Sequence, residues 1–190
     1  GDEAYDAVYE CQDANGEHGV RLDRNIVNIA GRTMEKNFTV LGPYVLPLSE
    51  QIRVVYTLAQ KKLCKYLCKT FDLHKETGAT YINKLISNWI PSKIPAYVPD
   101  FKRGIDYWCI HAGGRAVVDG VANNLRLQPE HAEPSKYALY NYGNTSSSSI
   151  WYEMDYVCKV QQPQKGHRIL QVAFGSGFKC NSAVWLCLHT

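Results

Sequence analysis

The chain has 190 residues, of which 45% are hydrophobic, 21% charged and 12% aromatic. This composition holds too much apolar material and too little net charge for a disordered chain, and the length suits a compact globular structure. The chain has 21 Lys and Arg residues and 18 Asp and Glu residues, which gives a formal net charge of +3. Because phosphate backbones select much stronger positive charge, we expect no nucleic-acid partner.

The first part of the chain predicts a hairpin followed by a helix. Alternating polarity over residues 5–12 and 18–22, on either side of turn-forming residues, is typical of a β-hairpin. Apolar residues then recur at helical spacing from a predicted N-cap at Asp23 to Asn37, and the glycine and prolines that follow predict the end of this helix.

A longer, basic amphipathic helix is predicted over residues 49–69, with Ser49 as its cap. Such a helix can lie on an anionic membrane surface, but packing against a core with a solvated lysine face is the commoner arrangement and is favoured here. Residues 70–100 carry frequent prolines, which exclude a long regular element. We expect a connector or a substrate-facing lid there.

The remainder predicts an α/β arrangement with two similar units of strand, glycine turn and helix. The predicted elements are a buried strand over 105–110 and a helix over 116–125, a strand over 136–142 and a helix over 151–156, and two strands over 168–174 and 182–188 that form an antiparallel hairpin.

His111 stands at the predicted carboxyl end of a strand, directly before Ala112, Gly113 and Gly114. Reactive groups of α/β proteins often lie at this position, and glycines let a substrate approach the backbone closely. His111 is therefore a candidate acid, base or hydrogen-bond donor to an oxyanion, although a histidine in such a place is more often structural.

Asn144 follows Gly143 and precedes a run of Thr and Ser residues. Its amide could cap the next helix, which spacing alone favours, or point its NH2 group into a cavity. The cysteines are scattered and odd in number, which fits a reducing compartment. Cys64 and Cys68 are interpreted as buried thiols, and Cys109, inside an apolar strand, as inert packing. The chain thus offers an acid/base candidate and an amide but no convincing nucleophile.

Several long strings resemble the membrane-bound 3-ketoacyl-CoA synthases that elongate very-long-chain fatty acids. The strings are Pro99–Lys102, Cys109–Val117, Tyr142–Glu153 and Ala173–Trp185, with further matches over Leu41–Pro43 and Val45–Gln51. The resemblance implies a thiolase-like fold, layered αβαβα, of which this chain is mainly the C-terminal half and incomplete without the N-terminal half. It implies a tail of the N-terminal condensing domain over residues 1–58, a connector or lid over 59–97, and a C-terminal domain over 98–190.

By the same resemblance, His111 and Asn144 are the histidine and asparagine of a Cys-His-Asn site whose cysteine lies in the missing upstream part. Gly113, Gly114, Gly175, Ser176 and Gly177 would line the substrate cavity. The implied reaction is a decarboxylative condensation of a long-chain acyl-CoA with malonyl-CoA. No metal and no cofactor besides the CoA thioester substrates are expected.

Two positions depart from the family pattern. Members often carry a histidine four residues before each of the two site residues, where this chain has Tyr107 and Tyr140. A tyrosine titrates near 10, which makes an acid/base role doubtful and leaves a packing role.

The resemblance further implies a homodimer, contacts with other elongase proteins, and the cytosolic face of the endoplasmic reticulum membrane, held by amino-terminal segments absent from this chain. No stretch of this sequence approaches the roughly 20 apolar residues that cross a bilayer. Two alternatives stay open: a soluble chalcone-synthase-like polyketide synthase, which has the same fold and the same three site residues, and a non-catalytic half-domain that binds a partner. Ala112, where the chalcone-synthase group favours proline, argues against the first.

Overall fold

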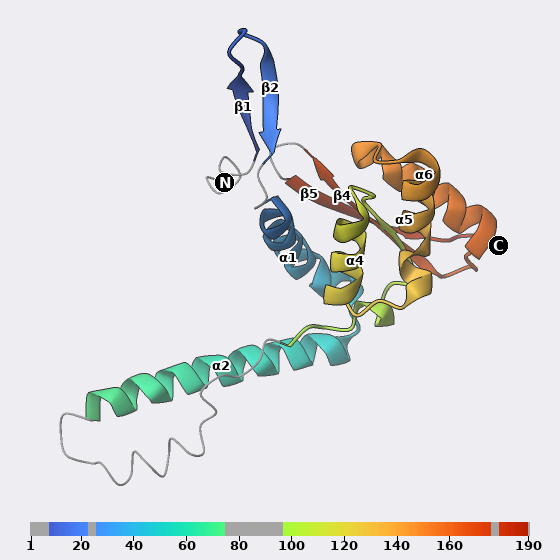
Figure 1. Ribbon diagram of the computed structural model, residues 1–190. Helices are drawn as coiled ribbons and strands as arrows, with labels where there is room; N and C mark the ends of the chain where they lie inside the picture. The colour runs from blue at the N-terminus through green and yellow to red at the C-terminus, as the bar shows by residue number, and fades with distance from the viewer. Residues whose placement is uncertain (1–7, 23–25, 75–96, 176–178, 190) are drawn as a thin grey trace. The chain divides into compact units, whose positions relative to one another are not determined.

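The computed structural model describes residues 8–22, 26–74, 97–175 and 179–189 (Figure 1). The chain divides into two compact units, one formed by Gly1–Val45 with Phe101–Thr190 and the other by Leu46–Asp100. Each is described by itself.

The first unit begins with the predicted hairpin, in which β1 (Val8–Gln12) pairs antiparallel with β2 (His18–Leu22). The Asp13 carboxylate closes the turn by accepting the backbone N–H groups of Asn15 at 2.8 Å and Glu17 at 2.9 Å. Such local side-chain bonding is the reason that Asp and Asn favour turns, and the hairpin prediction is confirmed.

The core of this unit is a sheet of β3 (Tyr107–Ile110), β4 (Arg168–Gly175) and β5 (Lys179–Leu186), in that order. β3 and β4 are parallel, whereas β4 and β5 are antiparallel. Trp108, Ile110 and Leu170 have no exposed surface, as expected for strands buried on both faces. The sheet and its helices agree with the predicted α/β class.

Helices make the crossover between the two parallel strands. They are α4 (Arg115–Asn124), α5 (Pro129–Tyr142) and α6 (Ser149–Tyr156), with short turns η4 (Ser146–Ser148) and η5 (Val157–Gln161) beside α6 and η3 (Phe101–Arg103) before β3. Helices α5 and α6 pack against β3, α4 packs against α5, and α1 (Ile26–Val45) packs against β5. The predicted strand and helix on either side of His111 are confirmed.

The prediction of a strand over 136–142 is wrong, because these residues form the second half of α5. Pro129 occupies the first turn, where a missing N–H costs nothing. Ala132, Ser135 and Ala138 are buried at a spacing of three residues, which is a helical period. The buried side of this helix is built from small residues, and the conspicuous tyrosines lie on the outside, so the apolar pattern was misinterpreted.

Helix α1 is longer than the predicted 23–37, because it continues to Val45 with Pro43 inside it. Met34, Phe38 and Val45 are all buried, so the apolar face continues past the predicted end. A proline in the last turn removes only one backbone donor from the helix. The proposed N-cap, Asp23, lies outside the described residues. β5 begins at Lys179, three residues before the predicted strand.

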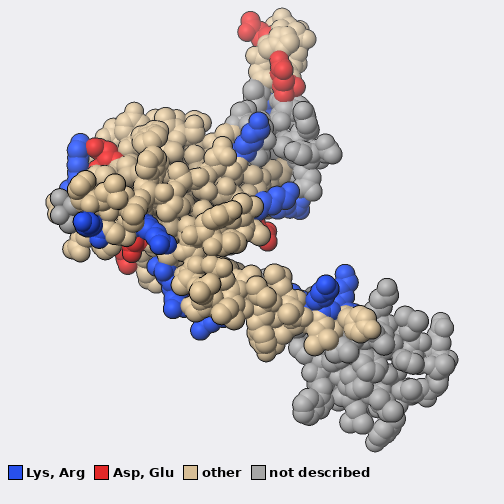
Figure 2. All heavy atoms as spheres, turned by 180° about the vertical axis from the view of Figure 1, so that it is seen from behind, with Lys and Arg blue, Asp and Glu red and all other residues tan. Residues whose placement is uncertain are grey.

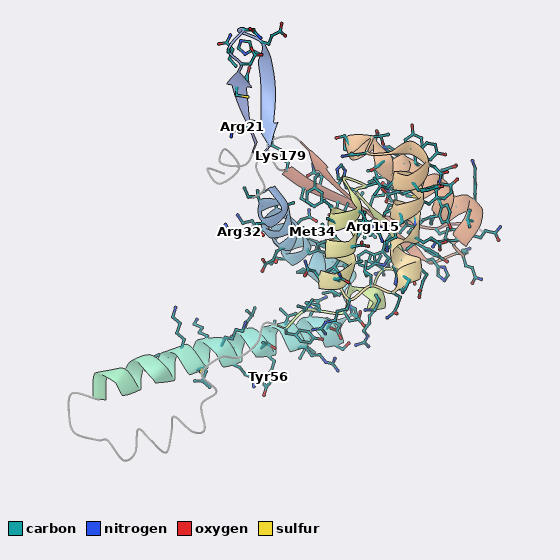
Figure 3. The ribbon with its side chains drawn as sticks, in the orientation of Figure 1. Arg21, Arg32, Met34, Tyr56, Arg115 and Lys179 are labelled. Carbon is teal, nitrogen blue, oxygen red and sulfur yellow. The ribbon has the colours of Figure 1, made fainter. Side chains whose placement is uncertain are left out.

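The described part of the second unit comprises Leu46 and Pro47, α2 (Leu48–His74) and the segment 97–100. The buried Glu50 carboxylate accepts a hydrogen bond from the Tyr97 hydroxyl at 2.5 Å and one from the Asp100 N–H at 3.1 Å. The helix predicted over 49–69 is confirmed, but it continues to His74, five residues into the segment expected to hold no long regular element. Ile52 and Val55 are exposed in the described structure, and Tyr56 projects away from the helix axis (Figure 3). The expected packing of this stripe against a core is therefore not present within this unit. Most of the predicted connector, residues 75–96, lies outside the described residues.

The surface charge is dispersed over the face in Figure 2, where Lys and Arg side chains stand singly or in small groups among uncharged residues. This distribution agrees with the small net charge of +3. Among the described residues, no helix combines the length and apolar content that crossing a membrane would require.

Candidate functional site

His111 lies one residue beyond the end of β3, where the chain leaves the sheet. Its backbone N–H still donates to the Val172 carbonyl of β4 at 2.9 Å, which fixes the position of its Cα atom. The Gly113 N–H then donates to the His111 carbonyl at 2.8 Å, so the backbone turns at once toward α4. Arg115, labelled in Figure 3, is the first residue of that helix.

The His111 ring packs directly on Gly113. A Cβ atom at position 113 would lie 2.9 Å from the Cδ2 atom and 3.0 Å from the Nε2 atom of the ring. Cβ atoms of real side chains essentially never come within 3.0 Å of such a neighbour, so a side chain at position 113 would displace the ring. The Phe174 ring lies edge-on to the imidazole, with ring centres 5.8 Å apart.

The His111 imidazole is buried, with 8% of the residue exposed. Burial lowers the pKa of His111 from its usual value of 6.5, because a low-dielectric environment disfavours the charged ring. A neutral imidazole donates one hydrogen bond and accepts one. The Nδ1 atom is buried and has no hydrogen-bond partner among the residues that the structure describes. The ring therefore keeps unused hydrogen-bonding capacity.

Asn144 reaches the same place from the end of α5. Gly143 stops the helix with φ at 70°, a left-handed conformation that favours glycine, and its N–H donates to the Leu139 carbonyl. The Asn144 Nδ2 atom then donates to the Gly113 carbonyl at 2.9 Å. Its Oδ1 atom accepts the Ser146 N–H at 2.8 Å.

The capping interpretation of Asn144 is realised in part, whereas a cavity at its NH2 group stays a prediction. The side-chain oxygen stabilises the local turn before α6, as a cap would, and the NH2 group bonds to a residue 31 positions earlier in the chain. The amide nitrogen carries two hydrogens, and Gly113 accepts only one of them.

Gly113 brings the two predicted site residues together, because the imidazole packs on its Cα atom and the Asn144 amide binds its carbonyl oxygen. An imidazole N–H and an amide N–H at one point on the protein can stabilise a negative charge that develops on a substrate oxygen. Both residues contact Gly113 in the structure. Their convergence on a substrate and their catalytic roles stay predictions.

The other predicted site residues are placed less clearly. Gly114 precedes α4 and its carbonyl accepts the Val117 and Val118 N–H groups at 3.0 and 3.1 Å. Gly175 ends β4, is exposed, and has open space where a Cβ atom would lie. Ser176 and Gly177 lie outside the described residues. Substrate contact by these four residues stays a prediction.

Cys109 is fully buried, which confirms its interpretation as a packing residue. Burial also raises the pKa of its thiol well above 9.0, and its low reactivity stays a prediction. Cys64, on helix α2, is half-buried in the described structure and not fully buried as predicted. The Cys68 side chain lies outside the described residues.

Tyr107 and Tyr140, the two departures from the family pattern, differ in environment. Tyr107 packs beside the buried cluster of Cys109, Val157 and Ile169, which suits a packing role. Tyr140 is 90% exposed on α5, so the packing role expected for it is wrong within the described structure.

Sequence reasoning missed a buried acid behind the site. Glu153 of α6 has no exposed surface, and its Oε2 atom accepts a hydrogen bond from the Ser135 hydroxyl at 2.8 Å. Burial raises the pKa of Glu153 from 4.5 to about 8, although the hydrogen bond from the Ser135 hydroxyl acts in the opposite direction. No hydrogen bond of good geometry reaches its Oε1 atom among the described residues. The only signal in the sequence is that Ser149 and Glu153 are four residues apart and so share a helix face.

Known proteins resemble this chain along almost its full length. A family model described as chalcone and stilbene synthases, C-terminal domain, matches residues 71–187, and one described as FAE1/type III polyketide synthase-like protein matches residues 1–63. The predicted domain limits at residues 58 and 97 stay a prediction.

Curated relatives include 3-ketoacyl-CoA synthase 9 of Arabidopsis thaliana, 45% identical over 99% of this chain and 32% of the relative, and 3-ketoacyl-CoA synthase 4 of the same plant, 44% identical over 99% of this chain and 31% of the relative. The chain thus spans about a third of the length of these relatives. The resemblance to 3-ketoacyl-CoA synthases stated from sequence is confirmed.

Solved structures establish the fold. The C-terminal type III polyketide synthase domain of Steely1 from Dictyostelium superimposes with a TM-score of 0.55 at 18% identity, covering 96% of this chain and 36% of that one. The 1,3,6,8-tetrahydroxynaphthalene synthase of Streptomyces coelicolor gives 0.52 at 18% identity, covering 99% and 38%. The predicted thiolase-like fold, present here in part, is confirmed.

Proposed function

We propose a condensing function from the premise that the chain belongs to the family of chalcone and stilbene synthase C-terminal domains. In this proposal the chain is part of a 3-ketoacyl-CoA synthase, an acyltransferase that joins a long-chain acyl-CoA to malonyl-CoA during fatty acid elongation. Identity of 45% to a protein of that name, over 99% of this chain, supports the assignment. The polyketide synthases are only 18% identical and support the fold alone.

The proposed reaction begins with an acyl chain held as a thioester on a cysteine outside this chain. Malonyl-CoA then loses CO2, and the electron pair of the broken carbon–carbon bond passes into an enolate. The enolate carbon attacks the acyl carbonyl carbon, the carbon–sulfur bond to the cysteine breaks, and the thiolate leaves. The product is a 3-ketoacyl-CoA two carbons longer.

His111 and Asn144 would act where negative charge develops. The neutral imidazole donates one hydrogen bond to the thioester oxygen as the enolate forms, and the second N–H of the Asn144 amide donates another. Donors fixed in advance are effective because they need no reorganisation during the reaction. The Gly113 carbonyl holds the amide at 2.9 Å, and this contact is the observation that carries the proposal.

The test uses a 3-ketoacyl-CoA synthase that has this chain as its matching segment, called here the full-length synthase. His111→Ala and Asn144→Ala are each expected to lower kcat about 100- to 1000-fold, the usual cost of losing one such donor. Tyr140→Phe is the matched control, because its side chain is 90% exposed. Elongation of a long-chain acyl-CoA with malonyl-CoA is followed by product chromatography. Product formation near the wild-type rate in either alanine variant would remove the assignment.

The remaining features of the proposal follow from the condensing function. Its partners are acyl-CoA and malonyl-CoA, a second copy of the synthase, and the other elongase proteins. Its place is the cytosolic face of the endoplasmic reticulum membrane, and it needs no metal or cofactor besides its thioester substrates. Fractionation of the full-length synthase with a microsomal marker, and crosslinking in microsomes, test the location and the partners.

A further inference from the structure

We propose that Glu153 is a positioning residue that, together with Ser135 and Ser149, fixes the backbone on both sides of His111. The inference rests on the proposed function, since it assigns these residues to the support of a hydrogen-bond donor in condensation. None of the three residues touches the reacting atoms in this proposal.

The evidence starts with the two residues that flank His111. The Ile110 N–H donates to the Ser135 hydroxyl oxygen at 3.0 Å, and the Ala112 N–H donates to the Ser149 hydroxyl oxygen at 3.1 Å. The His111 N–H itself donates in the other direction, to β4. Alternate N–H groups of a strand point to opposite edges, so two serines from α5 and α6 satisfy the edge of β3 that faces away from β4.

Glu153 controls the orientation of one of these serines. A hydroxyl has one hydrogen and rotates freely about its C–O bond unless that hydrogen is engaged. The Ser135 hydroxyl donates a hydrogen bond to the Glu153 Oε2 atom at 2.8 Å, and its lone pairs are thereby directed to the Ile110 N–H. Glu153 thus acts on the Ile110 contact through Ser135. Ser149, the first residue of α6, holds the Ala112 N–H by its own hydroxyl.

Stability alone does not account for a carboxyl group at this place. Glu153 has no exposed surface and makes no ion pair among the described residues, and one of its oxygens lacks a hydrogen-bond partner. An apolar side chain of similar size would fill this space without the cost of burying a polar group. The carboxyl group does what an apolar side chain cannot, because it accepts the Ser135 hydrogen and so orders the hydroxyl.

The ionisation state of Glu153 suits this role. Burial raises its pKa to about 8, so the group is mostly neutral at pH 7. A neutral acid still accepts the serine hydrogen bond, and it adds no negative charge that would oppose the enolate formed beside His111.

Four variants of the full-length synthase test the proposal. Glu153→Ala removes the acceptor, Glu153→Gln keeps an oxygen that can accept the Ser135 hydrogen, and Ser149→Ala removes only the contact to Ala112. Asp155→Asn is the matched control, because Asp155 lies on the same helix but is exposed and paired with Lys159. The measurements are kcat, KM and hydrogen–deuterium exchange of peptides that cover residues 107–114.

Glu153→Ala is expected to lower kcat about 100-fold, the cost of a misplacement near 1 Å at a catalytic group, with KM changed less than about threefold, as expected when ground-state binding is intact. Exchange at Ile110 should become faster while the peptides of β4 stay protected. Glu153→Gln should restore both kcat and protection, and Ser149→Ala should accelerate exchange at Ala112 and lower kcat. Asp155→Asn should match the wild type.

Normal kcat and normal protection in Glu153→Ala would overturn the proposal. If Glu153→Ala loses protection throughout the protein, Ser149→Ala provides the test instead. Unchanged kcat together with unchanged exchange at Ala112 in Ser149→Ala would also overturn the proposal. Failure of the proposed function has a different signature. His111→Ala would then retain condensation, while the exchange measurements would still show whether Glu153 holds the backbone.

Discussion

Replacement of Glu153 by Gln gives a test of the buried acid that is independent of catalysis. The pKa of Glu153 is raised from 4.5 to about 8 in the folded protein, whereas the unfolded chain ionises near the lower value. Between these pH values the folded state binds more protons, so the free energy of unfolding falls as the pH rises. One pKa unit corresponds to about 1.4 kcal/mol, which makes the loss roughly 3 kcal/mol at pH 7.

Gln has nearly the shape of Glu but does not titrate. Glu153→Gln should therefore match the wild type near pH 4.5 and be more stable by roughly 3 kcal/mol at pH 7. The titration of His111 has the opposite effect on the free energy of unfolding. Burial lowers its pKa, so below about pH 6.5 the unfolded chain binds more protons and the free energy of unfolding rises with pH. Both proteins contain His111, and its effect cancels in the difference between them.

The assay is urea unfolding of the full-length synthase between pH 4.5 and pH 8, followed by tryptophan fluorescence, because Trp108 of β3 is fully buried. Asp155→Asn provides the background for an exposed acid, for which we expect a change within about 1 kcal/mol at every pH. A difference between wild type and Glu153→Gln that stays constant across this range would refute a neutral Glu153.

Gly113→Ala should lower kcat at least about tenfold, because the new methyl group displaces the His111 ring; steady-state kinetics measure this effect. Gly120→Ala has open space for its methyl group and should stabilise α4 by up to about 1 kcal/mol, which urea unfolding measures. Cys109 should resist iodoacetamide in the native protein while the exposed Cys158 reacts, as mass spectrometry of labelled peptides would show. The 190-residue chain expressed alone should show no condensing activity and should aggregate through its exposed apolar surfaces, so turnover with acyl-CoA and malonyl-CoA by a monodisperse sample would contradict this prediction.

Local sequence signals were sufficient where the structure is decided locally. The hairpin is closed by the side chain of Asp13 bonding to its own turn. The strand before His111 is an uninterrupted apolar run, and the glycines after it mark the turn. These features depend on neighbours a few residues apart, so the sequence pattern contains most of their physical cause.

The features that sequence reasoning missed depend on contacts between distant residues. The segment 136–142 was misinterpreted because small residues such as Ser135 and Ala138 form the buried side of α5, and small side chains give a weak apolar pattern. The bond from Asn144 to Gly113 joins residues 31 positions apart, so spacing could not decide how the amide is used. Glu153 gave only a weak signal, its spacing of four residues from Ser149, because a glutamate on a helix is normally exposed.

One physical cause sets the charge state of both titratable groups at the site. Burial lowers the pKa of His111 and raises that of Glu153, because the low-dielectric core disfavours a positive ring and a negative carboxylate alike. At neutral pH the imidazole and the carboxyl group are therefore both mostly uncharged, and the groups around Gly113 act as hydrogen-bond donors and acceptors rather than as ions. A negative charge that forms on a substrate oxygen here would face hydrogen-bond donors, and Glu153, being mostly neutral, would not oppose it. Enolate formation requires such an environment.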